Sequence, residues 1–175
     1  MPPMPALLVS LAVILLSELS PPGIVHAAAR PPRTRNTPRQ ALTIIVNKSN
    51  PVENLSFAEL RKIFLGERSR WPNGHRVIVA MMEPGYAERK TILRDVYRMT
   101  ETEYRDYFLQ GTYTGDIPAS PKTLSSPAIL RKFVFNAPGA IGYLLASDVD
   151  ASVRVVRIDG RLPSDVEYKL QIDSD

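Results

Sequence analysis

Runs of strand-type residues alternate with well-marked helices along most of the chain, and this alternation limits the possible folds more than any other feature. The β-branched, apolar run 42–46 is typical of a buried strand. The run 77–82 is apolar at every position, as expected of a strand that is covered on both faces. Helix signals separate these runs. We therefore predict an α/β fold, a single domain whose mixed, mostly parallel sheet is flanked by helices.

Several helices are marked by their ends. Ser56 and Thr100 are each followed three positions later by glutamate, which is the spacing of a capping box. Glycine typically ends a helix, so we expect these two helices to stop at Gly66 and Gly111. The other expected elements are a helix from about 84 to 99, a long loop at 111–124, a helix capped by Ser126, and strands at 140–145 and 153–158.

The N-terminal residues have a different composition. Residues 1–27 hold an apolar run followed by a small-x-Ala pattern, which is typical of a signal peptide cleaved near Ala27; an uncleaved membrane tether is the alternative. Residues 28–41 are rich in arginine and proline and are expected to form a disordered linker. The alternative for this segment is an arm that binds an anionic partner. The protein is thus expected to be exported to the periplasm, with no transmembrane segment in its mature chain.

We assign the α/β domain to residues 42–160 and a polar C-terminal tail to residues 161–175. Much of the positive charge lies in the linker, so the domain itself is close to neutral and nucleic-acid binding is not expected.

The sequence lacks the usual combinations of catalytic residues. It contains no cysteine, which excludes disulfides, thiol nucleophiles and cysteine zinc sites. A Ser-His-Asp arrangement needs a histidine, and after residue 27 the one histidine is His75, in a turn; no Gly-x-Ser-x-Gly elbow is present either. The glycines at 139 and 142 fit neither a dinucleotide-binding motif nor a P-loop. We predict a non-enzymatic protein with no catalytic residue, metal site or cofactor.

Two features of the loops have structural interpretations. Gly142 lies within an expected strand, where a missing side chain usually marks the close approach of another backbone. Trp71, in a polar turn, is expected to fold back over the first helix as a lid on the core; the alternative is a surface anchor for a partner.

Three stretches together resemble a known family. They are "IIVNKSNPVENLSFAELRKIFLGERSRWPNG", "AERKTILRDVYRMTETEYRDYFLQGTYTGDIP" and "NAPGAIGYL". In this order they are similar to the phosphate-binding-protein-like (PBP-like) domain of bacterial periplasmic ABC-transporter substrate-binding proteins, over residues 42–158. The resemblance implies the fold of one lobe of a type 2 periplasmic binding protein. Complete members close two lobes on a ligand, so a single-lobe short form is implied here.

The resemblance also implies a function: an exported, substrate-binding-protein-like module that recognises phosphate or a related small oxyanion. The family's phosphate site has an arginine followed by Ser-Gly-Thr, whereas the corresponding segment here, "MMEPGYAERK", has no Ser-Gly-Thr. A glycine-led helix start remains, and its backbone N–H groups can bind anions. The alternative is a protein-interaction or adaptor domain that kept the fold and lost the ligand. Its partner would be another protein, or a second lobe supplied in trans.

The candidate ligand-binding residues lie in two segments. One follows the carboxyl end of the first strand, where open α/β sheets place their ligands, and the other begins the helix after the second strand. The candidates are Asn47, Lys48, Ser49, Gly85, Tyr86 and Arg89.

Overall fold

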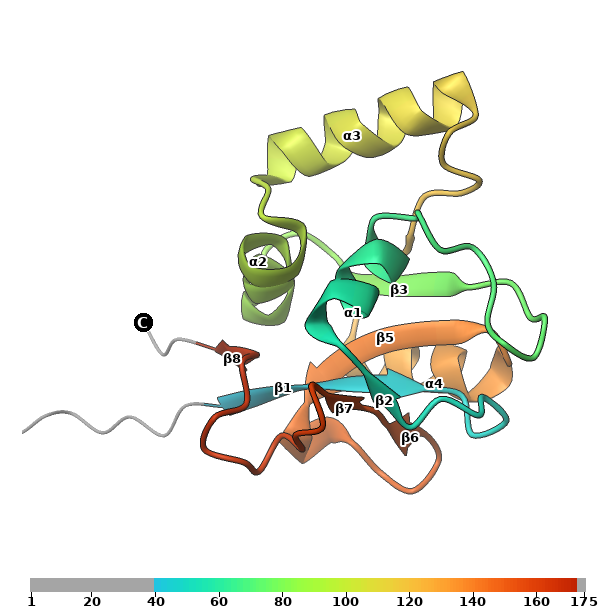
Figure 1. Cartoon of the computed structure of the whole chain (residues 1–175). Coiled ribbons are helices and arrows are strands. Elements are labelled where there is room, and N and C mark those ends of the chain that lie inside the picture. The colour runs from blue at the N-terminus through green and yellow to red at the C-terminus, as the bar shows by residue number, and fades with distance from the viewer. Residues whose placement is uncertain (1–39, 173–175) are drawn as a thin grey trace, which may run out of the picture. The chain divides into compact units, whose positions relative to one another are not determined.

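The structure, a computed structural model, describes residues 40–172. The signal peptide predicted at 1–27 and nearly all of the linker predicted at 28–41 lie outside the described residues. Gln40 and Ala41, which the prediction assigned to the linker, belong to the first strand. Strands and helices alternate along the described chain (Figure 1).

The main sheet has six strands within the described residues. They are Gln40–Val46 (β1), Ile78–Met82 (β3), Lys122–Leu124 (β4), Ala140–Leu145 (β5), Arg154–Val155 (β6) and Gln171–Ile172 (β8). The order is β4-β3-β5-β1-β6, with β8 beside the start of β1. β3 is parallel to β4 and β5, whereas β1 is antiparallel to β5, β6 and β8. A separate parallel pair joins Asn54–Leu55 (β2) to Arg157–Ile158 (β7).

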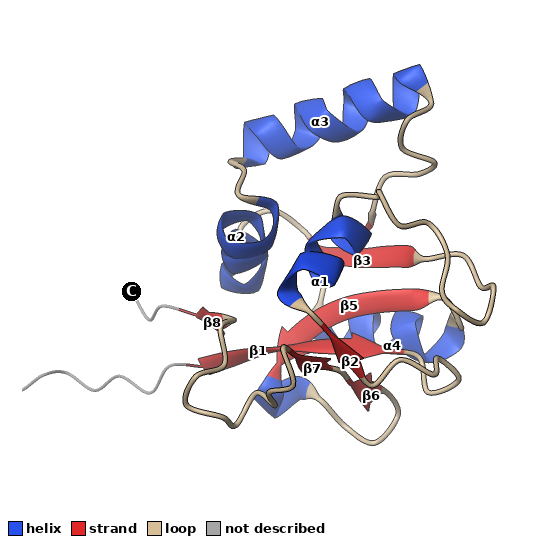
Figure 2. Ribbon diagram, in the orientation of Figure 1, coloured by secondary structure: helices blue, strands red, loops and turns tan. Residues whose placement is uncertain are grey.

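Four α-helices surround this sheet in the described part of the chain. They are Phe57–Phe64 (α1), Ala87–Ile92 (α2), Glu101–Thr114 (α3) and Pro127–Asn136 (α4). A π-helical segment, Leu93–Tyr97 (η1), continues α2, and a 3-10 turn, Ala146–Asp148 (η2), follows β5. Helices α1 and α4 lie on opposite faces of the sheet, with α3 outermost (Figures 1 and 2). The α/β class with a mixed, helix-flanked sheet is therefore confirmed.

Three predicted helix starts, those capped by Ser56, Thr100 and Ser126, are also confirmed. Ser56 and Thr100 each accept a hydrogen bond from the backbone N–H three residues later, and the glutamate there completes both capping boxes. Ser126 caps α4 by accepting from the N–H of Ile129. Each cap satisfies a backbone donor that the helix itself leaves without a partner.

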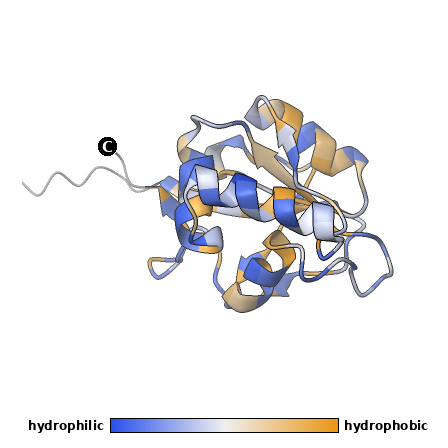
Figure 3. Cartoon of the chain, turned by 90° about the horizontal axis from the view of Figure 1, so that it is seen from above, coloured by the Kyte–Doolittle hydropathy of each residue, from blue (hydrophilic) through white to orange (hydrophobic). Residues whose placement is uncertain are grey.

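The core lies on both faces of β1 and β5 and continues into an aromatic cluster beneath α3. Seen from above, the strands are mainly hydrophobic while α3 is mainly hydrophilic (Figure 3). Edge-to-face pairs such as Tyr97–Tyr104, with ring centroids 5.0 Å apart, each contribute about 0.5–1.5 kcal/mol beyond the area they bury. The cluster consists of Phe64, Tyr97, Tyr104, Tyr107 and Phe108.

Two predicted helix boundaries are wrong. The second helix begins at Ala87 rather than 84, and it becomes π-helical at Leu93. The third helix does not stop at Gly111 but runs to Thr114. A Cβ on Gly111 would lie 2.4 Å from the Cδ1 of Ile117, so this glycine allows close packing instead of a turn. The loop predicted at 111–124 accordingly starts later, and it contains β4.

The C-terminal part is more structured than predicted. The strand expected at 153–158 is split into β6, which pairs with β1, and β7, which pairs with β2. Within the predicted tail, Tyr168 and Leu170 are buried, and the Tyr168 hydroxyl donates to the Leu42 carbonyl at 3.0 Å. The tail therefore folds onto β1 as far as Ile172, where the described residues end.

Candidate ligand-binding site

The two predicted site segments lie at opposite ends of the sheet. Because β1 is antiparallel to β5 and β3 is parallel to it, the carboxyl ends of β1 and β3 point in opposite directions. Asn47, just after β1, accordingly lies at the start of β5, where its N–H donates to the Ala140 carbonyl. The end of β3 lies at the other end of the sheet, beside α2. The prediction that Asn47, Lys48 and Ser49 form one site with Gly85, Tyr86 and Arg89 is thus corrected.

Asn47 acts within the fold. Its side-chain amide donates to the carbonyls of Val134 (2.9 Å) and Phe135 (2.6 Å) near the end of α4. Its Oδ1 accepts from the N–H (2.9 Å) and the hydroxyl (2.7 Å) of Ser49. With the side chain buried and both ends of the amide bonded, Asn47 joins the turn after β1 to α4. Lys48 and Ser49 are exposed on this turn.

The turn between β3 and α2 has a different character. Gly85 is exposed, with a positive φ of 105°, and nothing lies within 4 Å of where its Cβ would be. Tyr86 is the N-cap of α2 but makes no side-chain cap, unlike the caps of α1, α3 and α4. Its hydroxyl instead donates to the Ser125 carbonyl at 2.7 Å, which fixes the turn to the segment after β4. The amides at the start of α2 are therefore left without a side-chain acceptor.

Arg89, one turn into α2, is buried, and its guanidinium donates three hydrogen bonds. Its Nε and Nη2 donate to the two carboxylate oxygens of Glu101 at 2.9 and 2.5 Å, and its Nη1 donates to the Met82 carbonyl at 2.7 Å. Its guanidinium carbon lies 4.8 Å from the ring centre of Tyr104. Burial alone would lower the pKa of Arg89, but the hydrogen bonds and charge of Glu101 raise it above its ordinary value. Arg89 thus stays charged and ties β3, α2 and α3 together.

Tyr104 completes this arrangement from α3. Burial raises the pKa of Tyr104 to about 12, so the ring facing Arg89 remains neutral at physiological pH. Glu101 and Tyr104 were not predicted as partners of Arg89. They lie on the next helix, and no local spacing links them to Arg89.

A shallow pocket opens beside this turn, with a volume of about 460 Å³. Arg89, Glu101 and the exposed Arg105 lie along it, together with Pro84 and Tyr104. The turn and pocket lie at the carboxyl end of β3, next to the end of the parallel strand β4. This is the edge where α/β sheets usually bind ligands.

The described residues hold neither a candidate metal site nor a candidate membrane-spanning helix. Between residues 40 and 172, no group of three or more His, Asp or Glu side chains could hold a metal ion. No helix in that same range is both long and apolar enough to span a membrane.

Comparison with known proteins identifies the fold. Over 119 residues the chain is 33% identical to the phosphate-binding protein PstS of Bacillus subtilis. The fold is also that of an ABC-type phosphate transport receptor from Vibrio cholerae (TM-score 0.58, 21% identity) and of PstS from Borrelia burgdorferi (TM-score 0.62, 14% identity). The chain contains a phosphate-binding-protein-like domain. No protein-family model matches it.

The phosphate-binding-protein-like domain covers only part of each relative. The matched regions are 67% of this chain and 36% of the Bacillus protein. They are 72% of this chain and 49% of the Vibrio receptor, and 77% of this chain and 55% of the Borrelia protein. This extent fits the single-lobe form that the sequence analysis expected.

Proposed function

We propose that the protein is an exported, non-enzymatic substrate-binding-protein-like module that recognises phosphate or a related small oxyanion at the β3–α2 turn. The observation that carries this proposal is the 33% identity to the phosphate-binding protein PstS over 119 residues. Solved receptors for phosphate transport have the same fold, although their lower identity to this chain supports the fold alone.

The geometry of the turn supports an anion site made mainly of backbone groups. The start of α2 presents N–H groups without a side-chain cap, and the helix dipole favours negative charge there. Gly85 and Ala87 are exposed, so a small anion can approach. Glu101 compensates the charge of Arg89, and Glu83 lies on the exposed side of the turn. We therefore expect weak binding, with a dissociation constant of about 1 mM.

Thermal unfolding with and without phosphate tests this proposal. Phosphate at 100 times its dissociation constant should stabilise the protein by about 2.7 kcal/mol, beyond the effect of chloride at the same ionic strength. Sulfate should show whether the site accepts other oxyanions. Ala87→Pro removes an N–H at the first helical position, where proline is well tolerated, and Tyr86 already has the extended backbone required before proline.

Ala87→Ser is the matched control, because it keeps the N–H. We expect Ala87→Pro to lose the phosphate-specific stabilisation and Ala87→Ser to retain it. No difference between phosphate and chloride in the wild-type protein would refute oxyanion binding.

The absence of phosphate-specific stabilisation would favour the alternative, a protein-interaction or adaptor domain that pairs with another protein or with a second lobe in trans. Leu109 and Tyr113, four residues apart on α3, are 70% and 92% exposed and provide an apolar surface for such a partner. The surface anchor considered at Trp71 does not add to it, because Trp71 is 3% exposed.

Export to the periplasm is part of the proposal. Mass spectrometry of the protein from a periplasmic extract should give the mass of a chain that begins near residue 28. A full-length mass in the membrane fraction would instead favour the uncleaved tether.

A further inference from the structure

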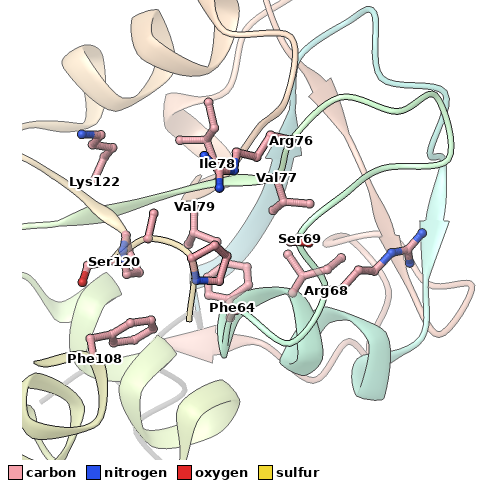
Figure 4. A pocket seen from close by; sticks show the side chains of 15 residues that line it. Phe64, Arg68, Ser69, Arg76, Val77, Ile78, Val79, Phe108, Ser120 and Lys122 are labelled. Atoms are coloured by element: carbon pink, nitrogen blue, oxygen red, sulfur yellow. The ribbon is translucent and has the colours of Figure 1, made fainter. Parts of the chain in front are cut away.

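A second pocket adjoins the one beside the β3–α2 turn and shares Phe108, Ser120 and Pro121 with it, but none of the proposed oxyanion-binding residues line it. Its volume is about 280 Å³, and it lies between the end of α1, the start of β3, Phe108 of α3 and the segment 118–122 (Figure 4). Of its apolar lining residues, Phe64, Val79 and Phe108 are buried, whereas Val77, Ile78, Pro118 and Pro121 are more accessible. The pocket therefore presents mainly aliphatic surface to a ligand that can enter it.

The charged residues of this pocket are all of one sign. Arg68, Arg76 and Lys122 line it, and no lining residue is acidic. Figure 4 shows Arg68 and Lys122 on opposite sides of the pocket, with Phe64 and Val79 between them.

These cations differ in how far the fold already engages them. Arg68 has a distant ion pair with Glu59, at 3.8 Å, and a long hydrogen bond to the Arg70 carbonyl, at 3.4 Å. Within residues 40–172, the side chains of Arg76 and Lys122 make no hydrogen bond or ion pair, and both residues are exposed. Long side chains of this kind can reorient over an apolar surface while they keep the charge in water.

We propose that this pocket binds a small organic anion with an apolar body, of the class of the aromatic carboxylates. The ring would lie against Val77, Ile78 and Pro121, and the carboxylate would face Arg76 and Lys122. Inorganic phosphate has no apolar part to bury on this surface, so the ligand class differs from the one proposed for the β3–α2 turn. The pocket is also small, and this volume suits one ring better than an extended chain.

Benzoate is a suitable probe, followed by ¹H–¹⁵N chemical-shift titration of the purified protein. Benzamide has the same ring without the charge, and acetate has the charge without the ring. We expect saturable shifts at residues 76–79 and 118–122 with benzoate, and affinities about tenfold weaker for benzamide and acetate. Equal affinity for benzoate and benzamide, or no saturable shift in these segments, would overturn the proposal.

Substitutions of the two exposed cations test whether they bind the carboxylate of benzoate. Arg76→Gln and Lys122→Gln should each weaken benzoate binding about threefold to tenfold and leave the response to phosphate unchanged. Lys132→Gln removes an exposed charge from α4, outside the pocket, and should change neither. Unaltered benzoate affinity in both pocket variants would contradict the assignment. This test uses residues outside the β3–α2 turn, so its failure is distinguishable from failure of the proposed phosphate binding.

Discussion

The indole of Trp71 donates its Nε1–H to the carbonyl oxygen of Gly139 at 2.9 Å. The same carbonyl accepts from the N–H of Ile78, the first residue of β3, at 3.0 Å. Two motifs that carry the family resemblance, the tryptophan turn and the Pro-Gly-Ala-Ile-Gly segment, therefore meet at one point. Trp71 is buried in the core, as expected from the sequence, and Gly139 and Gly142 lie where a Cβ would come too close to neighbouring atoms.

Gly139→Ala tests this close contact. A Cβ on Gly139 would lie 1.9 Å from the carbonyl oxygen of Arg76, a backbone atom that cannot move alone. We expect a loss of about 2–4 kcal/mol in the free energy of unfolding, measured by chemical denaturation. Gly142→Ala is the comparison, because its Cβ would meet mainly the flexible end of Leu130, at 2.8 Å, and should cost about 1 kcal/mol. Equal costs would show that the backbone at Gly139 yields easily.

Glu101→Gln tests the ion pair with Arg89. The substitution leaves a buried guanidinium with a neutral partner, but the Glu101 side chain is 47% exposed, so water offsets part of the loss. We expect a decrease of about 1–2 kcal/mol in the free energy of unfolding. Asp106→Asn makes the same chemical change in an exposed pair and should alter stability by less than about 0.5 kcal/mol. If the Glu101→Gln protein were as stable as the Asp106→Asn protein, the Arg89–Glu101 pair would contribute nothing measurable to the free energy of unfolding.

Leu170→Ala tests whether the C-terminal segment belongs to the folded domain. Leu170 is fully buried against β1, and Val166, four residues earlier, is fully exposed. We expect Leu170→Ala to destabilise the protein by about 2–4 kcal/mol and Val166→Ala to change stability by less than about 0.5 kcal/mol. Thermal unfolding of both variants gives the comparison. Similar stability for the two would indicate a segment that is dispensable in solution.

Asp159 predicts a dependence of stability on acid pH. Its hydrogen bond to Lys169, helped by one from the Phe57 N–H, lowers the pKa of Asp159 below its ordinary value of 3.8. A lowered pKa in the folded state contributes stability above the unfolded pKa, and this contribution is lost as the pH falls through the folded pKa. Stability should therefore fall below about pH 4 in the wild-type protein.

Asp159→Asn should flatten that part of the pH profile. Asparagine tolerates the left-handed backbone of this position, where φ is 52°, so the fold is expected to persist. Unfolding in denaturant between about pH 2 and pH 6 measures the slope. An identical slope in the variant would assign the acid sensitivity to other carboxylates.

The sequence predicted the elements better than their arrangement. Capping residues and apolar runs are local signals, so the starts of α1, α3 and α4 and the strands β1, β3 and β5 could be identified from short stretches. A buried strand has the same residues whether it runs parallel or antiparallel. The direction of β1 therefore cannot be predicted from its residues. For this reason the prediction wrongly placed Asn47 at the same end of the sheet as Gly85.

The site residues show the same limit. Arg89 was identified from its place at a helix start, but its partner Glu101 lies on the next helix, beyond a π-helical turn and a left-handed residue, Arg98. Which acid neutralises Arg89 depends on how α3 packs against the preceding helical segment. That packing includes the ring contacts of Tyr97 with Tyr104 and Phe108, which lie far from Arg89 in the sequence.

A ¹H–¹⁵N titration with inorganic phosphate, at constant ionic strength, determines whether the β3–α2 turn binds phosphate. We expect saturable shifts that are concentrated in the amides of residues 85–88, absent in Ala87→Pro and retained in Ala87→Ser. The absence of shifts at the β3–α2 turn, or shifts confined to the pocket lined by Arg76 and Lys122, would contradict phosphate recognition at this turn.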